Sequence, residues 1–450
     1  MFEYRVPGVY RQEVTLRAEP GLATGVPGFV GFADVIWEPL TALPVGVVFP
    51  TALEGKVRYD EQRHLLIVSK AMSPQEESLL ASLSPEGSFT NAVTALFTKS
   101  QGEALPLPNS PVLLQRQADF DSKFIGSPDG YLADAVAGFF TNGGLRCYVV
   151  RADPEAETET AILDAVESLA EVEDLDLVAV PDAMTLRRDN SGVVSPDRDA
   201  ITRVQVGVLD HCTRHQGRFA ILDSRTDLSV EEVTGQRDDL VRGLVEPVNG
   251  ALYYPWLKLD QVRLVPPSGH VAGIYARTDE KAGYFKAPAN EEILGIVDLE
   301  VPIGNSEQDK LNPIGVNCLR AFPGRGIRVW GARTISGDPN WRYINVRRLF
   351  LTLQRWIDRN MAWANFEPNT PRLWVRISRE LSGFLDGLWR AGALAGQTRD
   401  QAYYVKCDSE TNPLEIREAG QTITEIGLAP GRPAEFVVVR IVHQTGVEPR

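Results

Sequence analysis

Cysteine is scarce in this sequence, and its four cysteines lie far apart, at Cys147, Cys212, Cys318 and Cys407. This spacing suits reduced, buried thiols in a cytosolic protein. No apolar run approaches the roughly 20 residues that a membrane-spanning helix needs. The first residues have neither a basic start nor an apolar stretch, so no secretory signal is expected. We therefore expect synthesis in the cytoplasm and no direct insertion into a membrane.

Positive charge is also in short supply. The 46 basic residues are outnumbered by 60 acidic ones, which leaves a net charge of −14. A protein that binds the phosphate backbone of a nucleic acid needs a net basic face, so we do not expect nucleic acid as a partner. With 450 residues, 43% of them hydrophobic, the chain is long enough for two or three domains with sizeable cores.

Lysine is absent between Asn312 and Asp400, where arginine takes its place. This stretch has 14 arginines and six acidic residues, so it carries about +8 and leaves about −22 on the remainder. An arginine-only segment on an acidic protein indicates a contact surface, because the planar guanidinium makes paired hydrogen bonds to carboxylates. The alternative is that these are ordinary solvated helix faces. The candidate contact residues are Arg347, Arg348, Arg355, Arg359, Arg379 and Arg390.

Two helices are predicted within this segment. Val346, Leu349 and Leu353 recur at helical spacing in the first. Thr370 and Pro371 open the second as an N-cap and a first helical residue, and its apolar stripe follows from Trp374 onward.

No set of residues in the sequence assembles a catalytic site. Asn142-Gly143-Gly144 ends a predicted helix and precedes a strand, which is the reverse of a phosphate loop and indicates a helix C-cap. His211 and His215 are spaced i, i+4 on a predicted helix, as two metal ligands would be, but no third ligand is evident. We expect no catalytic residue, no cofactor and no metal site. A metal-dependent α/β enzyme that uses these two histidines remains the alternative.

Helices and strands alternate from Val112 to about Pro302, which predicts an α/β layer with a partly parallel sheet. Residues 41–111 differ in composition and end in a proline-rich stretch, so we expect an inserted module of strands and short helices there. Overall we predict an α/β (α+β) fold with mixed sheets flanked by helices. The expected divisions are an N-terminal arm (1–20), a middle domain (21–40 and 112–305), the inserted module (41–111) and a C-terminal domain (306–450).

Strand-like segments near both termini have no nearby hairpin partner. Unpaired strand edges invite pairing with another molecule, so we expect both segments to pair, either within the subunit or between subunits. The residues concerned are Val9, Tyr10, Glu13, Phe436, Val438, Arg440 and Ile441.

Several ordered motifs closely resemble contractile tail sheath proteins, and most of them lie in the arginine-rich segment. They are Asn312-Pro-Ile-Gly-Val-Asn, Gly326-Ile-Arg-Val-Trp-Gly-Ala-Arg-Thr and Trp341-Arg-Tyr-Ile-Asn-Val-Arg-Arg, together with Pro7-Gly-Val-Tyr and Arg218-Phe-Ala-Ile-Leu-Asp. The resemblance covers most of the chain apart from the inserted module.

The resemblance implies a structural subunit rather than an enzyme. Its copies would polymerise as a helical cylinder around an inner tube, exchange terminal strands, and contract to drive the tube through a target envelope. Implied partners are other copies or a paralogous sheath subunit, the inner tube protein, and baseplate and terminator or cap proteins. The cylinder would belong to a phage-tail-like particle or virion, with release by lysis as one route out of the cell. A non-contractile baseplate or tail protein remains a second alternative.

Overall fold

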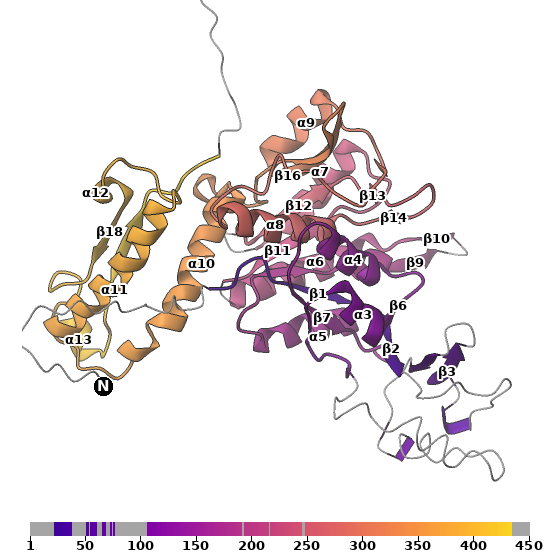
Figure 1. Ribbon diagram of the computed structural model, residues 1–450, viewed down its shortest axis with the longest axis horizontal. Coiled ribbons are helices and arrows are strands. Elements are labelled where there is room, and N and C mark those ends of the chain that lie inside the picture. Colours follow the sequence, from indigo (N-terminus) through magenta and orange to yellow (C-terminus); the bar gives the residue numbers. More distant parts are fainter. Residues whose placement is uncertain are drawn as a thin grey trace, which may run out of the picture.

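The computed structural model describes residues 22–37, 51–53, 55–60, 65–68, 73, 75–76, 106–190, 193–215, 217–244 and 248–433. Figure 1 shows an α/β body and a smaller C-terminal lobe, with the long helix α10 (Ile344–Asn360) between them. The predicted α/β class is confirmed.

The body is organised around one mixed sheet of eight strands. In spatial order they are β17 (Gly326–Trp330), β16 (Val316–Phe322), β12 (Gly250–Tyr254), β11 (Phe219–Asp223), β8 (Leu177–Ala179), β1 (Pro27–Gly31), β7 (Cys147–Arg151) and β5 (Val112–Leu114). The pairs from β16 to β7 are parallel, and the two edge strands β17 and β5 run antiparallel to their neighbours.

Helices cover both faces of this sheet, so its strands are apolar on both sides. Phe29 and Val30 are adjacent in β1 and fully buried, yet they belong to hydrophobic cores on opposite faces. One core receives α5 (Thr158–Ser168), α6 (Arg198–Arg214), α7 (Val230–Val241) and the end of α9 (Asn305–Leu311). The other receives α3 (Gln117–Lys123), α4 (Leu132–Thr141), α8 (Ser268–Ala282) and part of α10.

A second sheet has the order β3 (Val57–Asp60), β4 (Leu65–Val68), β2 (Ala33–Trp37) and β6 (Phe124–Gly126). The strands expected within residues 41–111 are therefore represented by the antiparallel pair β3–β4. It is not detached from the core, because β4 pairs with β2, which follows the central strand β1 after one residue. Ser73 and Glu76 form a capping box, since Ser73 N donates to the Glu76 carboxylate and Glu76 N donates to Ser73 Oγ.

The C-terminal lobe consists of α11 (Pro371–Arg390), α12 (Arg399–Ala402), α13 (Leu414–Glu418), and the strand pair β18 (Tyr403–Lys406) and β19 (Glu425–Leu428). Because β16 and β17 extend the central sheet, the domain boundary expected at 305/306 cuts through that sheet. The last strand of that sheet along the chain, β17, ends at Trp330.

Smaller elements complete the described chain. They are the hairpin β9 (Arg187–Asn190) and β10 (Val193–Pro196), the strands β13 (Leu257–Lys258), β14 (Leu264–Val265) and β15 (Asp298–Leu299), and short 3-10 turns at Thr51–Leu53, Leu169–Glu171, Pro181–Thr185, Asn312–Ile314, Pro339–Trp341 and Ala362–Ala364. None of the described helices combines the length and apolar character that a membrane crossing requires.

Candidate functional site: the α10 junction and the histidine cluster

Arg348 joins α10 to the body through a buried ion network. Its guanidinium donates to both oxygens of Asp279, at 2.8 and 2.6 Å, and to Asp176 Oδ2 at 3.0 Å. All three side chains are almost fully buried. Asp176 also accepts hydrogen bonds from the backbone N–H groups of Gly25 and Val26, so the segment that enters β1 is tied to α10 through one carboxylate.

Arg355 adds a second tie two turns further along α10. Its Nη2 donates to the carbonyl oxygen of Ala23 at 2.9 Å and to that of Asp174 at 3.3 Å. Gly217 has φ +87° and lies against the aliphatic part of Arg355, which leaves no space for a Cβ. The first described residues of the chain are thus fastened to the helix that joins the two lobes.

The prediction that Arg348 and Arg355 contact another molecule is wrong, because they are only 2% and 7% exposed. The physical reason is that α10 is buried on two sides. Its Ile344 and Leu351 pack in the core of the body, while Leu349 and Leu353 pack against α11. Arg348 turns inward to two carboxylates, and Arg355 turns inward to two backbone carbonyl groups, all of the same subunit.

The other four candidate arginines differ in exposure. Arg347 is half-buried, donates to Asn249 Oδ1 at 2.6 Å and lies over the ring of Trp341. Burial lowers the pKa of Arg347 to about 10. Arg359, Arg379 and Arg390 are exposed. A surface contact therefore remains a proposal for these three residues.

The second predicted helix is found as α11, with Thr370 at the N-cap and Pro371 at its first position. Its buried residues are Leu373, Trp374, Ile377, Leu381, Leu385 and Leu388, which include most of the predicted stripe. The strand pair β18–β19 packs beside α11 and has no third strand among the described residues. The predicted arm residues Val9, Tyr10, Glu13, Phe436, Val438, Arg440 and Ile441 lie outside the described residues.

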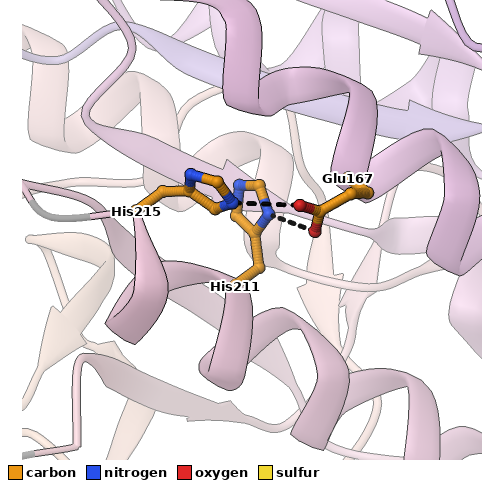
Figure 2. Close-up of side chains that lie close together, drawn as sticks. All are labelled: Glu167, His211 and His215. Carbon is orange, nitrogen blue, oxygen red and sulfur yellow. Dashed lines mark hydrogen bonds and ion pairs between the residues drawn. The ribbon is translucent and has the colours of Figure 1, made fainter.

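His211 and His215 from α6 meet Glu167 from α5, as Figure 2 shows. His211 Nδ1 is 3.4 Å and His215 Nε2 is 3.0 Å from the Glu167 carboxylate. Sequence reasoning missed Glu167 as the third residue because it lies 44 positions before His211 on another helix, and no local pattern marks it.

Two arginines decide the chemistry of this cluster. Arg214 donates to both Glu167 oxygens, at 3.2 and 2.9 Å, and Arg218 Nη1 lies 2.6 Å from His211 Nε2. A guanidinium can only donate, so His211 Nε2 accepts and the ring proton sits on Nδ1, facing Glu167. Both ring nitrogens of His211 are then engaged, and neither offers a lone pair to a metal ion.

The pKa values in the cluster follow from this arrangement. Burial, reinforced by the Arg218 charge, lowers the pKa of His211 to about 4, so the ring is neutral at neutral pH. The hydrogen bond from Arg214 lowers the pKa of Glu167 to about 2. The geometry favours an ion-pair network that fastens α5 to α6 over a metal centre.

The Asn142-Gly143-Gly144 sequence is confirmed as a helix C-cap. Asn142 is the C-cap of α4, and Gly143 follows in the left-handed region with φ +95°. The Asn142 side chain also exchanges hydrogen bonds with the backbone of Leu294. No phosphate loop is formed here, because the strand β7 follows the glycines.

The sequence of this chain matches known protein families. Residues 155–335 match the family model described as the phage tail sheath protein central domain, and residues 336–444 match the phage tail sheath C-terminal domain. The chain belongs to the tail sheath protein family. The two models meet at 335/336, after the central sheet ends and before α10 begins.

Sequence relatives and solved structures agree with this assignment. The tail sheath protein of Vibrio phage KVP40 is 24% identical over 283 residues, which cover 62% of this chain and 40% of the relative. A chain of the anti-feeding prophage (AFP) baseplate is 27% identical with a TM-score of 0.66, over 98% of this chain and all of that one. The AFP helical sheath in its contracted state is 26% identical with a TM-score of 0.65 and the same coverage. The chain spans less than half the length of the curated relatives that it matches.

Proposed function

We propose that this protein is a structural subunit of a contractile sheath. Its copies polymerise as a helical cylinder around an inner tube, and contraction of the cylinder drives the tube through a target envelope. The observation that carries the proposal is the likeness to the contracted AFP helical sheath, which extends over 98% of this chain and the whole of that chain. The similarity to a chain of the AFP baseplate supports a cylinder that begins on a baseplate.

Electron microscopy of the purified, overexpressed chain tests the proposal. A sheath subunit is expected to form long hollow cylinders, or to form them once the tube protein of the same gene cluster is added. Particles that stay monomeric under both conditions would contradict a sheath role. Metal analysis of the same preparation addresses the enzyme alternative, in which a stoichiometric metal bound through His211 and His215 would be required.

Strand exchange through the arms is the proposed link between copies. A two-stranded sheet is marginally stable in water, so β18–β19 has edges suited to further strands. Deleting residues 1–14 should leave a soluble, folded subunit that does not polymerise, measured by circular dichroism and electron microscopy. Cylinders of normal length from the deleted chain would refute the exchange.

Contact with the inner tube is proposed for the exposed arginines Arg359, Arg379 and Arg390. Exposed ion pairs are weak, on the order of 0–1 kcal/mol each, and salt screens them. Repetition along a cylinder adds them up, yet they separate easily on contraction. Charge reversal at all three positions should weaken tube-templated assembly at low salt and have less effect at high salt. The matched control is Arg242→Glu on the surface of the body.

A further inference from the structure

Phe366 stands out on the surface of the C-terminal lobe. It lies in the turn between α10 and α11, its side chain is fully exposed, and its φ is +66°. The left-handed region of φ is unfavourable for residues other than glycine, above all for bulky ones. In addition, a large apolar side chain that is exposed to water contributes no hydrophobic stabilisation. This arrangement does not stabilise an isolated subunit, which suggests that the Phe366 ring is buried against another molecule.

A groove of about 1020 Å³ lies at the junction of the body and the lobe. Phe285 and Trp330 line it from the body, and Ala393 and Pro433 line it from the lobe. The groove is much larger than one aromatic ring, and its aromatic and small apolar walls suit an apolar side chain. Asn345, in the first turn of α10, also lines the groove.

Phe366, which forms the tip of the turn after α10, and the groove lie at opposite ends of α10. This helix has 17 residues, so its axis is about 25 Å long, and Phe366 lies beyond its far end. Phe366 therefore cannot reach the groove of its own subunit without unfolding. Phe366 projects at one end of the helix and the groove lies at the other, so the two can form a head-to-tail contact between copies. Such a contact builds a helical polymer when the rotation that relates neighbouring copies does not close a ring.

The charges beside the two features are complementary. Glu367 follows Phe366 and is exposed, with no ion pair among the described residues. The exposed Arg432 lines the groove. Of the other charged residues of the lining, Lys286 pairs with Glu291, Arg333 is buried, and Asp309 is acidic. The acidic Glu367 beside the apolar Phe366 is thus complementary to the exposed Arg432 at the groove.

We propose that Phe366 of one copy enters the groove of a neighbouring copy, with Glu367 facing Arg432. This contact rests on the proposed function, because it joins copies within the cylinder. It requires no exchange of the terminal arms, since all of its residues lie outside them.

The first test is Phe366→Gly. Glycine relieves the positive φ, so the free subunit should be at least as stable as the parent in thermal unfolding. Loss of the buried ring should raise the protein concentration needed for cylinders at least about tenfold. Val375→Ala is the control, since Val375 is also an exposed apolar residue of the lobe and lies outside the contact. A destabilised Phe366→Gly subunit, or one that assembles at the parent's concentration, would overturn the proposal.

The second test exchanges the charges. Glu367→Arg and Arg432→Glu should each impair assembly, and the double variant should restore it. A disulfide between Glu367→Cys and Arg432→Cys should then join copies in cylinders, because the four native cysteines are buried. Cross-linking of the tip to the tube protein would assign Phe366 to the tube and overturn the contact between copies. Failure of the unmodified chain to form cylinders both alone and with the tube protein refutes the proposed function as well. Normal cylinders from every Phe366 and Glu367 variant refute this contact alone.

Discussion

At the scale of single residues, the buried ion network around Arg348 is expected to be sensitive to substitution. Removing one partner of a buried ion pair leaves the remaining charges without compensation, which typically costs about 3–5 kcal/mol. We expect Arg348→Met to lower the free energy of unfolding by about this amount, because Asp176 and Asp279 stay buried. Chemical denaturation of the unassembled subunit measures it.

Arg390→Met is the matched control for this substitution. Arg390 pairs with Asp386 on the surface of α11, and its side chain is 75% exposed. Its loss should change stability by less than about 1 kcal/mol. Equal effects of the two substitutions would show that the Arg348 network adds no more than a surface pair.

The lowered pKa of His211 predicts that part of the free energy of unfolding is lost in acid. Its pKa of about 4 in the folded protein lies below the ordinary value of 6.5, so between these values the unfolded chain binds more protons. The stabilisation contributed by neutral His211 is complete above pH 6.5 and is lost as the pH falls toward 4. The loss is at most about 3.5 kcal/mol, since one pKa unit corresponds to about 1.4 kcal/mol.

The comparison of His211→Gln with the parent isolates this term. Burial raises the pKa of Asp182 to about 6 and that of Asp223 to about 7, so their ionisation destabilises the fold as the pH rises through the same window. These opposing terms are present in both proteins and cancel in the difference. The parent should lose stability relative to His211→Gln between pH 6.5 and 4, measured by urea denaturation. A constant difference over this range would contradict the assignment of His211.

At the scale of elements, α4 and α8 cross with their backbones close together. Gly269 of α8 faces the backbone of Ala135 in α4, and a Cβ added at Gly269 would overlap it. Overpacking in a core costs typically about 1–3 kcal/mol, so Gly269→Ala should lower the free energy of unfolding by that amount. Gly235→Ala in α7 is the control, because nothing lies within 4 Å of its added Cβ and alanine favours a helix. We expect the control to be neutral or stabilising in thermal unfolding, and destabilisation of similar size in both variants would argue against a special role of this crossing.

Elements with local signals were predictable from the sequence. The strand Cys147–Arg151 and the start of α11 at Thr370-Pro371 were found as predicted, because apolar runs, glycines and caps mark such elements within a few residues. Pairings between distant segments carry no local mark. The junction of β4 with β2, the attachment of β16–β17 to the central sheet, and the meeting of Glu167 with α6 all depend on the finished fold.

The arginines of α10 show the same limit for the candidate site. A helical pattern distinguishes one apolar stripe from one polar face, and it assigns every arginine to solvent. Because α10 contacts both the body and the lobe, Arg348 and Arg355 are enclosed while Arg359 stays exposed. The family resemblance, by contrast, depends on ordered motifs and was confirmed by the comparisons.

At the scale of the whole molecule, the question is where a contracting assembly would obtain its work. The described residues contain neither a phosphate loop nor an assembled catalytic set, and the histidine cluster is engaged by Arg214 and Arg218. We propose that the subunit lattice stores this work: the extended cylinder is trapped by the tube and baseplate, and the contracted one buries better-matched surface between copies. A difference of a few kcal/mol per subunit is then sufficient, because it is multiplied over many copies and retained by a kinetic barrier.

Isolated particles test whether the lattice is the source of work. They should contract on exposure to acid, denaturant or baseplate disruption without added nucleotide, and they should stay contracted after the trigger is removed, because the contracted lattice is the more stable state. Electron microscopy of particles before treatment, after treatment and after return to the starting buffer measures both. Pretreatment with a nucleotide-hydrolysing enzyme is the control. Contraction that stops after this pretreatment, or cylinders that lengthen again in the starting buffer, would contradict a lattice-stored source of work.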